Sequence, residues 1–216
     1  MNYLVHLYLS GPDPELRLGG LMGDFVKGPL DDRYPPGIVA GLRLHRTIDS
    51  LAATSPYCRA SRRRLHSRFG HTRAVLVDIF YDHFLAVHWD TFQQQPLAAF
   101  AADTYRLLHH HRDLLPEGLA RIAPRMAAHD WLTSYRDRAS VKIALERIAT
   151  RLSRPTALGE GVVELERCGE ELLGDFRGFM AETGATVNNI LRDNPAPGRT
   201  SRGSGGPSPA RPRPGR

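Results

Sequence analysis

The sequence predicts an all-α fold, a single-domain helical bundle followed by a polar C-terminal tail. Apolar residues recur at helical spacing through most of the chain, and no stretch shows the apolar–polar alternation of a half-buried strand. Breakers such as Gly28-Pro29 separate the periodic stretches. With 216 residues, of which 41% are hydrophobic and 24% charged, the chain is long enough to bury one core.

The periodic stretches give the expected helices in chain order. The first nine residues are apolar apart from His6 and a few small polar groups, and Gly11-Pro12 ends that run. Helices are expected over residues 15–26, 37–51, 56–69, 72–89, 97–111, 117–129, 140–152 and 162–191. The start at residue 56 has the clearest signal, because Ser55 suits an N-cap and Pro56 suits the first turn.

The net charge of +6 is concentrated at the end of the chain. Residues 194–216 are rich in Pro, Gly and Ser and contain five arginines and no acid, so residues 1–193 are nearly neutral. A segment with so little apolar surface cannot offset its ordering entropy, and we expect this tail to be disordered. We therefore expect one helical domain over residues 1–193 and no nucleic-acid binding by it.

Cysteine usage and hydropathy indicate a reduced, aqueous setting. Cys58 and Cys168 lie far apart and form no zinc-binding or redox pattern. No apolar run approaches the roughly 18 residues that span a bilayer, and the first residues lack the basic and apolar regions of a secretory signal. We expect a cytoplasmic protein that does not bind a membrane, and the sequence leaves its oligomeric state open.

Two aspartates within an apolar stretch are the most unusual feature of the sequence. Asp78 and Asp82 are four residues apart in an expected helix and therefore share one face. Like charges at this spacing repel, and burying them is costly unless a cation compensates. A wet helix face with arginine partners is the alternative. His83 lies about 100° around the axis from Asp82, so it is either a metal ligand or a general acid.

Other stretches of the first half supply matching groups. Asp24 lies near the end of one expected helix, His45 and Asp49 share a face of the next, and His6 lies in the apolar start. Imidazoles and carboxylates without thiolates suit Mn²⁺, Fe²⁺, Mg²⁺ or Zn²⁺ in hydrolysis, where the metal polarises a phosphoryl oxygen and lowers the pKa of bound water. Arg46 could neutralise developing phosphoryl charge.

One expected helix is strongly basic. Its arginines are Arg59, Arg62, Arg63, Arg64 and Arg68. A solvated basic face is the simpler interpretation, although such a face can also steer an acidic partner.

Four motifs, in this order, resemble the bacterial acyl-carrier-protein phosphodiesterases, also called holo-ACP hydrolases. They are residues 1–7 (MNYLVHL), 23–28 (GDFVKG), 41–49 (GLRLHRTID) and 78–85 (DIFYDHFL), with Trp89 nearby. The likeness covers roughly residues 1 to 190. One departure is Tyr8, because that family commonly has a second histidine at this place, two positions after His6.

The resemblance implies a fold and a reaction. The family is helical and distantly similar to the HD-type phosphohydrolases, which implies an HD-like bundle. The implied reaction hydrolyses the phosphodiester between 4'-phosphopantetheine and a serine of holo acyl carrier protein, a step connected with fatty acid biosynthesis. The implied cofactor is a divalent metal, which we expect to be Mn²⁺, with Mg²⁺ or Fe²⁺ as alternatives.

The resemblance also implies roles for individual residues. The expected metal ligands are Asp24, His45, Asp78 and Asp82, with His6 as an additional candidate. The expected catalytic residues are Arg46, Asp49 and His83. The five arginines of the basic helix would dock the acidic carrier protein.

Two other functions stay open at this point. One is an HD-like phosphohydrolase that acts on a nucleotide or another small phosphodiester. The other is a non-catalytic helical module that binds acidic proteins through its basic helix. Metal content separates them, because a non-catalytic module should purify without stoichiometric metal and ignore chelators.

Overall fold

The computed structural model describes residues 3–30 and 33–193, and within these ranges it contains helices and no strands. The α-helices are α1 (Tyr3–Leu9), α2 (Pro14–Met22), α3 (Pro36–Thr54), α4 (Pro56–Arg64), α5 (Arg73–Val87), α6 (Leu97–His110), α7 (Glu117–Ala128), α8 (Trp131–Ser134), α9 (Arg138–Ala149) and α10 (Glu164–Asp193). Short 3₁₀ helices are η1 (Ser67–Thr72), η2 (Trp89–Thr91), η3 (Arg112–Leu114) and η4 (Ala157–Val163). The predicted all-α class is confirmed.

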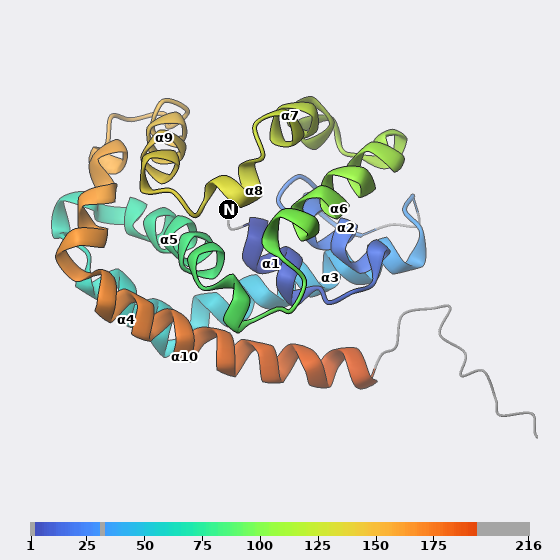
Figure 1. Cartoon of the computed structure of the whole chain (residues 1–216), viewed down its shortest axis with the longest axis horizontal. Coiled ribbons are helices and arrows are strands. Elements are labelled where there is room, and N and C mark those ends of the chain that lie inside the picture. Colours follow the sequence, from blue (N-terminus) through green and yellow to red (C-terminus); the bar gives the residue numbers. More distant parts are fainter. Residues whose placement is uncertain (1–2, 31–32, 194–216) are drawn as a thin grey trace, which may run out of the picture.

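The helices pack around α1 and α5 (Figure 1). Helix α1 packs against α2 and α5, while the long helix α10 lies along one edge of the molecule and contacts α3, α4 and α5. Helix α9 packs on the other side of α5, and α6 to α8 complete the bundle beside α2. All of α1 except Tyr8 is buried, so this short helix is a central element of the fold.

Helix α5 is buried on nearly all sides, which explains why its sequence lacks a clean polar face. Its buried residues include Phe80, Leu85 and the polar pair Asp82 and His83. Trp89, two residues after the end of α5, is also fully buried, with its indole Nε1 donating a 2.6 Å hydrogen bond to the carbonyl of Gln95. The core of the molecule is therefore continuous along α5.

Two glycines allow α2 and α3 to approach closely. A Cβ built on Gly19 would lie 2.2 Å from the carbonyl oxygen of Ile38, and one on Gly41 would lie 2.4 Å from that of Leu16. Real Cβ atoms do not come so near a backbone oxygen, so any larger residue would push the helices apart. This contact places the polar residues of α3 directly beside the end of α2.

Some predicted helix boundaries were wrong. The basic helix ends at Arg64 instead of Phe69, because the backbone of Leu65 is extended and η1 begins two residues later. The helix α1 and the four-residue helix α8 were not predicted as such. Isolated helices of this length are unstable in water, so both depend on tertiary contacts.

The predicted disorder of the C-terminal tail, residues 194–216, lies outside the described residues. Within the part of the chain that is described, the helices are too short or too polar to cross a membrane.

Candidate active site

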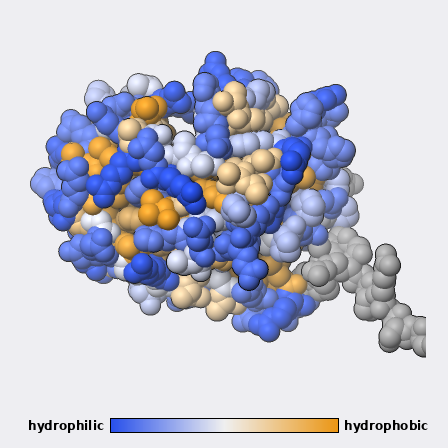
Figure 2. Space-filling view, viewed as in Figure 1, coloured by the Kyte–Doolittle hydropathy of each residue, from blue (hydrophilic) through white to orange (hydrophobic). Residues whose placement is uncertain are grey.

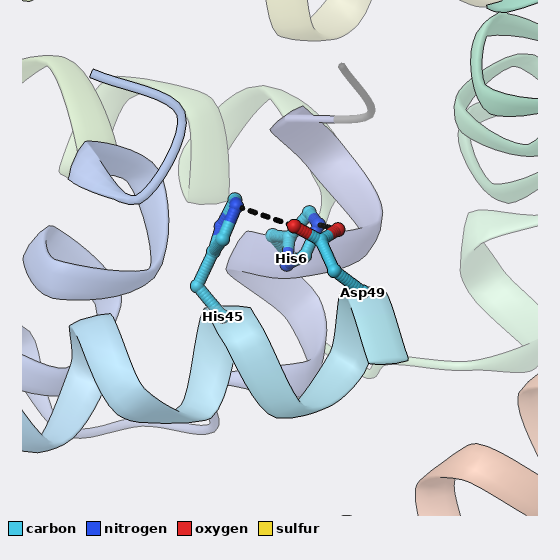
Figure 3. Close-up of side chains that lie close together, drawn as sticks. All are labelled: His6, His45 and Asp49. Atoms are coloured by element: carbon cyan, nitrogen blue, oxygen red, sulfur yellow. Dashed lines mark ion pairs between the residues drawn. The ribbon is translucent and has the colours of Figure 1, made fainter. Parts of the chain in front are cut away.

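The described residues contain one set of three side chains whose donor atoms could hold a metal ion together, namely His6, His45 and Asp49. Helix α1 provides His6, and helix α3 provides the other two (Figure 3). Their donor atoms all lie within 4.8 Å of one another. Both histidines are only 3% exposed, whereas the Asp49 side chain is 59% exposed. We refer to these three residues as the His–His–Asp cluster, which opens to solvent at Asp49.

The carboxylate of Asp49 bridges the two imidazoles. Its Oδ1 lies 3.2 Å from Nε2 of His6, and its Oδ2 lies 3.2 Å from Nε2 of His45. The two rings stack, with centroids 3.9 Å apart and an interplanar angle of 17°. Nitrogen lone pairs and carboxylate oxygens repel at this distance, so positive charge, from protons or from a cation, must lie between them.

Burial and Asp49 together set the charges of the cluster. Burial lowers the pKa of His6, an effect that the hydrogen bond to Asp49 does not overcome. Burial also lowers the pKa of His45, but the hydrogen bond and charge of Asp49, together with Asp24, outweigh it and raise the pKa overall. Burial raises the pKa of Asp49, yet the hydrogen bonds from both imidazoles hold it well below its usual range. Asp49 is therefore ionised.

Backbone atoms of α2 orient His45. Nδ1 of His45 lies 2.7 Å from the carbonyl oxygen of Gly20, so Nδ1 carries a proton and Nε2 is directed at Asp49. A Cβ built on Gly23 would lie 2.1 Å from the imidazole ring, so a side chain there would displace His45. The sequence alone did not predict this role of Gly23, although Gly23 and Asp24 begin the motif at residues 23–28.

Asp24 lies at the edge of the cluster. Its Oδ1 is 3.9 Å from Nε2 of His45, and its side chain is 24% exposed. The predicted proximity of Asp24 and His45 is therefore present, at a distance longer than a hydrogen bond. Arg46 faces the loop after α2 instead, where its Nη2 donates to the carbonyls of Gly28 at 2.7 Å and Val26 at 3.4 Å. Arg46 thus fixes the loop that follows Asp24.

Asp82, a predicted metal ligand, lies outside the His–His–Asp cluster and binds backbone N–H groups of α1. Its Oδ2 accepts a 3.0 Å hydrogen bond from the N–H of Leu4, and its Oδ1 accepts a 2.9 Å hydrogen bond from the N–H of Val5. Both oxygens therefore cap the first turn of α1, whose N–H groups have no partner within the helix. Asp82 is fully buried, and burial raises its pKa to about 7 even though the two N–H groups lower it. Asp82 holds in place the helix that carries His6.

Asp78 and His83 also lie outside the His–His–Asp cluster. Asp78 is half-buried on α5 and belongs to no set of three or more described residues that could hold a metal ion, so its role as a ligand stays a prediction. Nδ1 of His83 lies 2.7 Å from the carbonyl oxygen of Tyr135, and burial lowers the pKa of this imidazole. His83 therefore anchors the segment between α8 and α9, and its catalytic role stays a prediction.

The five arginines of the basic helix fall into two groups. Three have partners: Arg59 donates to the carbonyl of Thr54, Arg64 pairs with Asp175 at 2.8 Å, and Arg68 pairs with Glu160 at 2.9 Å. The guanidinium groups of Arg62 and Arg63 form no hydrogen bond or ion pair with other described residues. Only these two are available to an acidic partner without breaking an internal contact.

The fold and the cluster together define the chain as a helical protein with an imidazole and carboxylate site built from separate helices. Comparison with known proteins then shows the family to which the chain belongs. The model of the acyl carrier protein phosphodiesterase family matches residues 1–183. The chain therefore belongs to this family of phosphodiesterase enzymes.

Individual relatives agree with the family match. The chain is 31% identical over 168 residues to an acyl carrier protein phosphodiesterase of Photorhabdus laumondii, which covers 77% of this chain and 85% of that protein. It is 30% identical over 183 residues to one of Serratia proteamaculans, which covers 84% and 95%. A third, from Escherichia coli, is 29% identical over 167 residues, covering 77% and 86%. No solved structure matches the chain.

Proposed function

We propose that this chain hydrolyses the phosphodiester that joins 4'-phosphopantetheine to a serine of holo acyl carrier protein, and that it uses a divalent cation for this reaction. The His–His–Asp cluster is the observation that carries the proposal, because its two imidazoles are buried while its carboxylate opens to solvent. The names of the relatives support the carrier protein as the substrate.

The donor set of the cluster fits a divalent cation. Two Nε2 atoms and two carboxylate oxygens face one another and require positive charge between them. The Nδ1–H of His45 is tied to a carbonyl oxygen, as is usual for histidines that bind metals. His6, His45 and Asp49 would hold the ion, and imidazole with carboxylate suits Mn²⁺, with Fe²⁺ or Mg²⁺ as alternatives. When bound, the ion would supply Lewis-acid polarisation of a phosphoryl oxygen.

The chain's own residues supply the remaining parts of the reaction. The Asp24 carboxylate lies beside His45 and is partly exposed, so it is placed to orient a water molecule or to take its proton. Arg46 fixes the loop after Asp24 through the carbonyls of Gly28 and Val26. Arg46 is therefore a positioning residue in this proposal, and the attacking water approaches from the solvent side of Asp49.

Arg62 and Arg63 are the residues of the basic helix best suited to dock the carrier. Acyl carrier proteins are acidic, and these two guanidinium groups have no competing partner among the described residues. Electrostatic attraction of this kind accelerates encounter and weakens as salt is added.

The test is incubation of the purified chain with holo acyl carrier protein and Mn²⁺, followed by intact-mass measurement of the carrier. A decrease in carrier mass equal to one phosphopantetheine would support the proposal, provided that no such decrease occurs with Asp49→Asn or in the presence of chelator. An exposed aspartate far from the cluster in sequence, Asp113, gives a matched control variant, Asp113→Asn, which should retain activity. A carrier that keeps its mass with every divalent metal would refute the proposal.

A further inference from the structure

A cavity of about 230 Å³ lies between α5, α8 and α9 and reaches the start of α1. Its wall includes Tyr3, Trp131, Ile143, Ala144, Arg147 and Arg151. The volume is far larger than the roughly 10–15 Å³ that one water molecule requires. Most of the lining is aliphatic or aromatic, and none of the described acidic residues takes part in it. Figure 2 shows this side of the molecule, where smaller hydrophobic areas interrupt a mostly hydrophilic surface.

The cavity adjoins the proposed reaction site through Tyr3. Tyr3 lines the cavity, and His6 of the His–His–Asp cluster lies three residues later on the same helix. Residues three apart on a helix share a face, with Cβ atoms about 5–6 Å apart. The residues of the cluster do not line the cavity. The cavity and the cluster are therefore separate sites, and each includes one residue of α1.

Electrostatics agree with this placement. Burial is the main cause that raises the pKa of Tyr3, the Asp24 carboxylate raises it further, and the Arg151 guanidinium lowers it. The phenol of Tyr3 is thus within electrostatic reach of one residue beside the cluster and of one residue of the cavity.

The mouth of the cavity is positively charged. Arg147 lies on α9 and Arg151 lies two residues after the end of that helix, and both line the cavity. Both are exposed, and neither guanidinium forms an ion pair or hydrogen bond with another described residue. Ile143 lies on the same helix and is 45% exposed, which is unusual for a large aliphatic side chain. The rim thus offers hydrogen-bond donors around an apolar interior.

We propose that this cavity binds the pantetheine arm of the substrate while the adjoining phosphate lies at the His–His–Asp cluster. This inference rests on the proposed function. The arm is a chain with a gem-dimethyl group and two amides, so its apolar part suits the aliphatic wall, and its carbonyl oxygens suit the free donors of Arg147 and Arg151. A cavity beside the cluster also gives a physical basis for selecting this phosphodiester over others, because only a substrate with the arm fills it.

The experiment measures binding of pantetheine, which lacks the phosphate, by isothermal titration calorimetry and by ligand-observed NMR. Both measurements are made in the presence of chelator. Ala144→Trp should fill the cavity and weaken binding by about tenfold or more. Lys142→Trp is the matched control, because Lys142 is exposed on the same helix and does not line the cavity. Arg147→Glu with Arg151→Glu alters only exposed side chains, so it tests the rim without disturbing the core.

Weakened pantetheine binding in Ala144→Trp and in the double arginine variant, with wild-type binding in Lys142→Trp, would support the inference. A raised KM for holo carrier protein in the same two variants, relative to Lys142→Trp, would support it further. Equal pantetheine binding in all variants, or none in the wild type, would overturn it. Hydrolysis of holo carrier protein by the wild type is scored separately, so failure of the reaction and failure of the cavity assignment are distinguishable.

Discussion

The backbone of Gly23 lies directly against the imidazole of His45, and a Cβ at Gly23 would come within 2.1 Å of that ring. The same imidazole is held from behind by the carbonyl oxygen of Gly20. The backbone at the end of α2 therefore fixes the position of the His45 ring. Asp24 directly follows Gly23, the residue whose missing side chain leaves room for that ring.

Replacing Gly23 with alanine should move His45 out of line with Asp49. We expect Gly23→Ala to lower the free energy of unfolding by about 1–3 kcal/mol, the usual cost of forcing extra volume into a packed site, and to weaken Mn²⁺ binding. Denaturant unfolding and Mn²⁺ titration measure the two effects. Gly174→Ala on α10 is the control, because no atom lies within 4 Å of its added Cβ, and it should be neutral or slightly stabilising.

Two buried histidines provide a matched pair for testing metal binding. His45 and His83 both direct Nδ1 at a carbonyl oxygen 2.7 Å away, but only His45 belongs to the His–His–Asp cluster. We expect His45→Ala to reduce Mn²⁺ affinity by at least about 100-fold. Residues that only hold a metal ligand in place already contribute up to about 100-fold, so loss of a ligand should cost at least as much. His83→Ala should lower thermal stability with Mn²⁺ affinity retained, as titration calorimetry can establish. Equal Mn²⁺ affinities in the two variants would place the metal elsewhere.

The buried carboxyl of Asp82 should make stability depend on pH. Burial raises its pKa from 3.8 to about 7, so between these values the folded chain binds more protons at Asp82 than the unfolded chain does. This group's contribution to stability is therefore present at low pH and is lost as the pH rises from about 4 to 7, by at most about 1.4 kcal/mol per pH unit.

Asp82→Asn should remove that slope, because the amide does not titrate. It should also destabilise α1 by about 1–3 kcal/mol, since the amide NH₂ cannot accept the hydrogen bond of Leu4 or Val5. Urea unfolding at several pH values measures both effects. Asp90→Asn changes an exposed aspartate near the same helix and should keep the wild-type slope. A slope that survives in Asp82→Asn would show that another group causes it.

Charge reversal at Arg62 and Arg63 should impair carrier recognition without affecting the fold. We expect the double glutamate variant to raise KM for holo carrier protein by about tenfold at low salt and to flatten its salt dependence, because steering by charge is screened at higher ionic strength. Kinetics at several salt concentrations test this. The pair Arg121 and Arg125 on α7 gives a control with the same change of charge. Unchanged KM in the Arg62 and Arg63 variant would remove α4 from the docking surface.

Periodicity predicted the long helices well, because α3, α6 and α10 each bury one continuous apolar face. It could not identify α1, whose seven residues are nearly all apolar and are helical only because distant partners surround them. The i, i+4 relation of His45 and Asp49 was correctly predicted, since it depends on one helix alone.

The same reasoning did not predict the contact of Asp82 with the N-terminus of α1, and the reason is physical. A buried carboxylate needs compensating donors, and a cation and a helix N-terminus satisfy this need equally well. The choice between them depends on which element packs against α5, and the local sequence does not contain that information. The two backbone N–H groups that bind Asp82 belong to residues 78 and 77 positions away.

That separation has a consequence for how the protein is made. His6, Asp24, His45 and Asp49 all lie in the first quarter of the chain, yet the helix that presents His6 is capped by a residue of α5. A nascent chain that has left the ribosome as far as α3 therefore contains every residue of the site but not its support. Because contacts between such distant residues form late, we expect the site to assemble only after α5 has emerged.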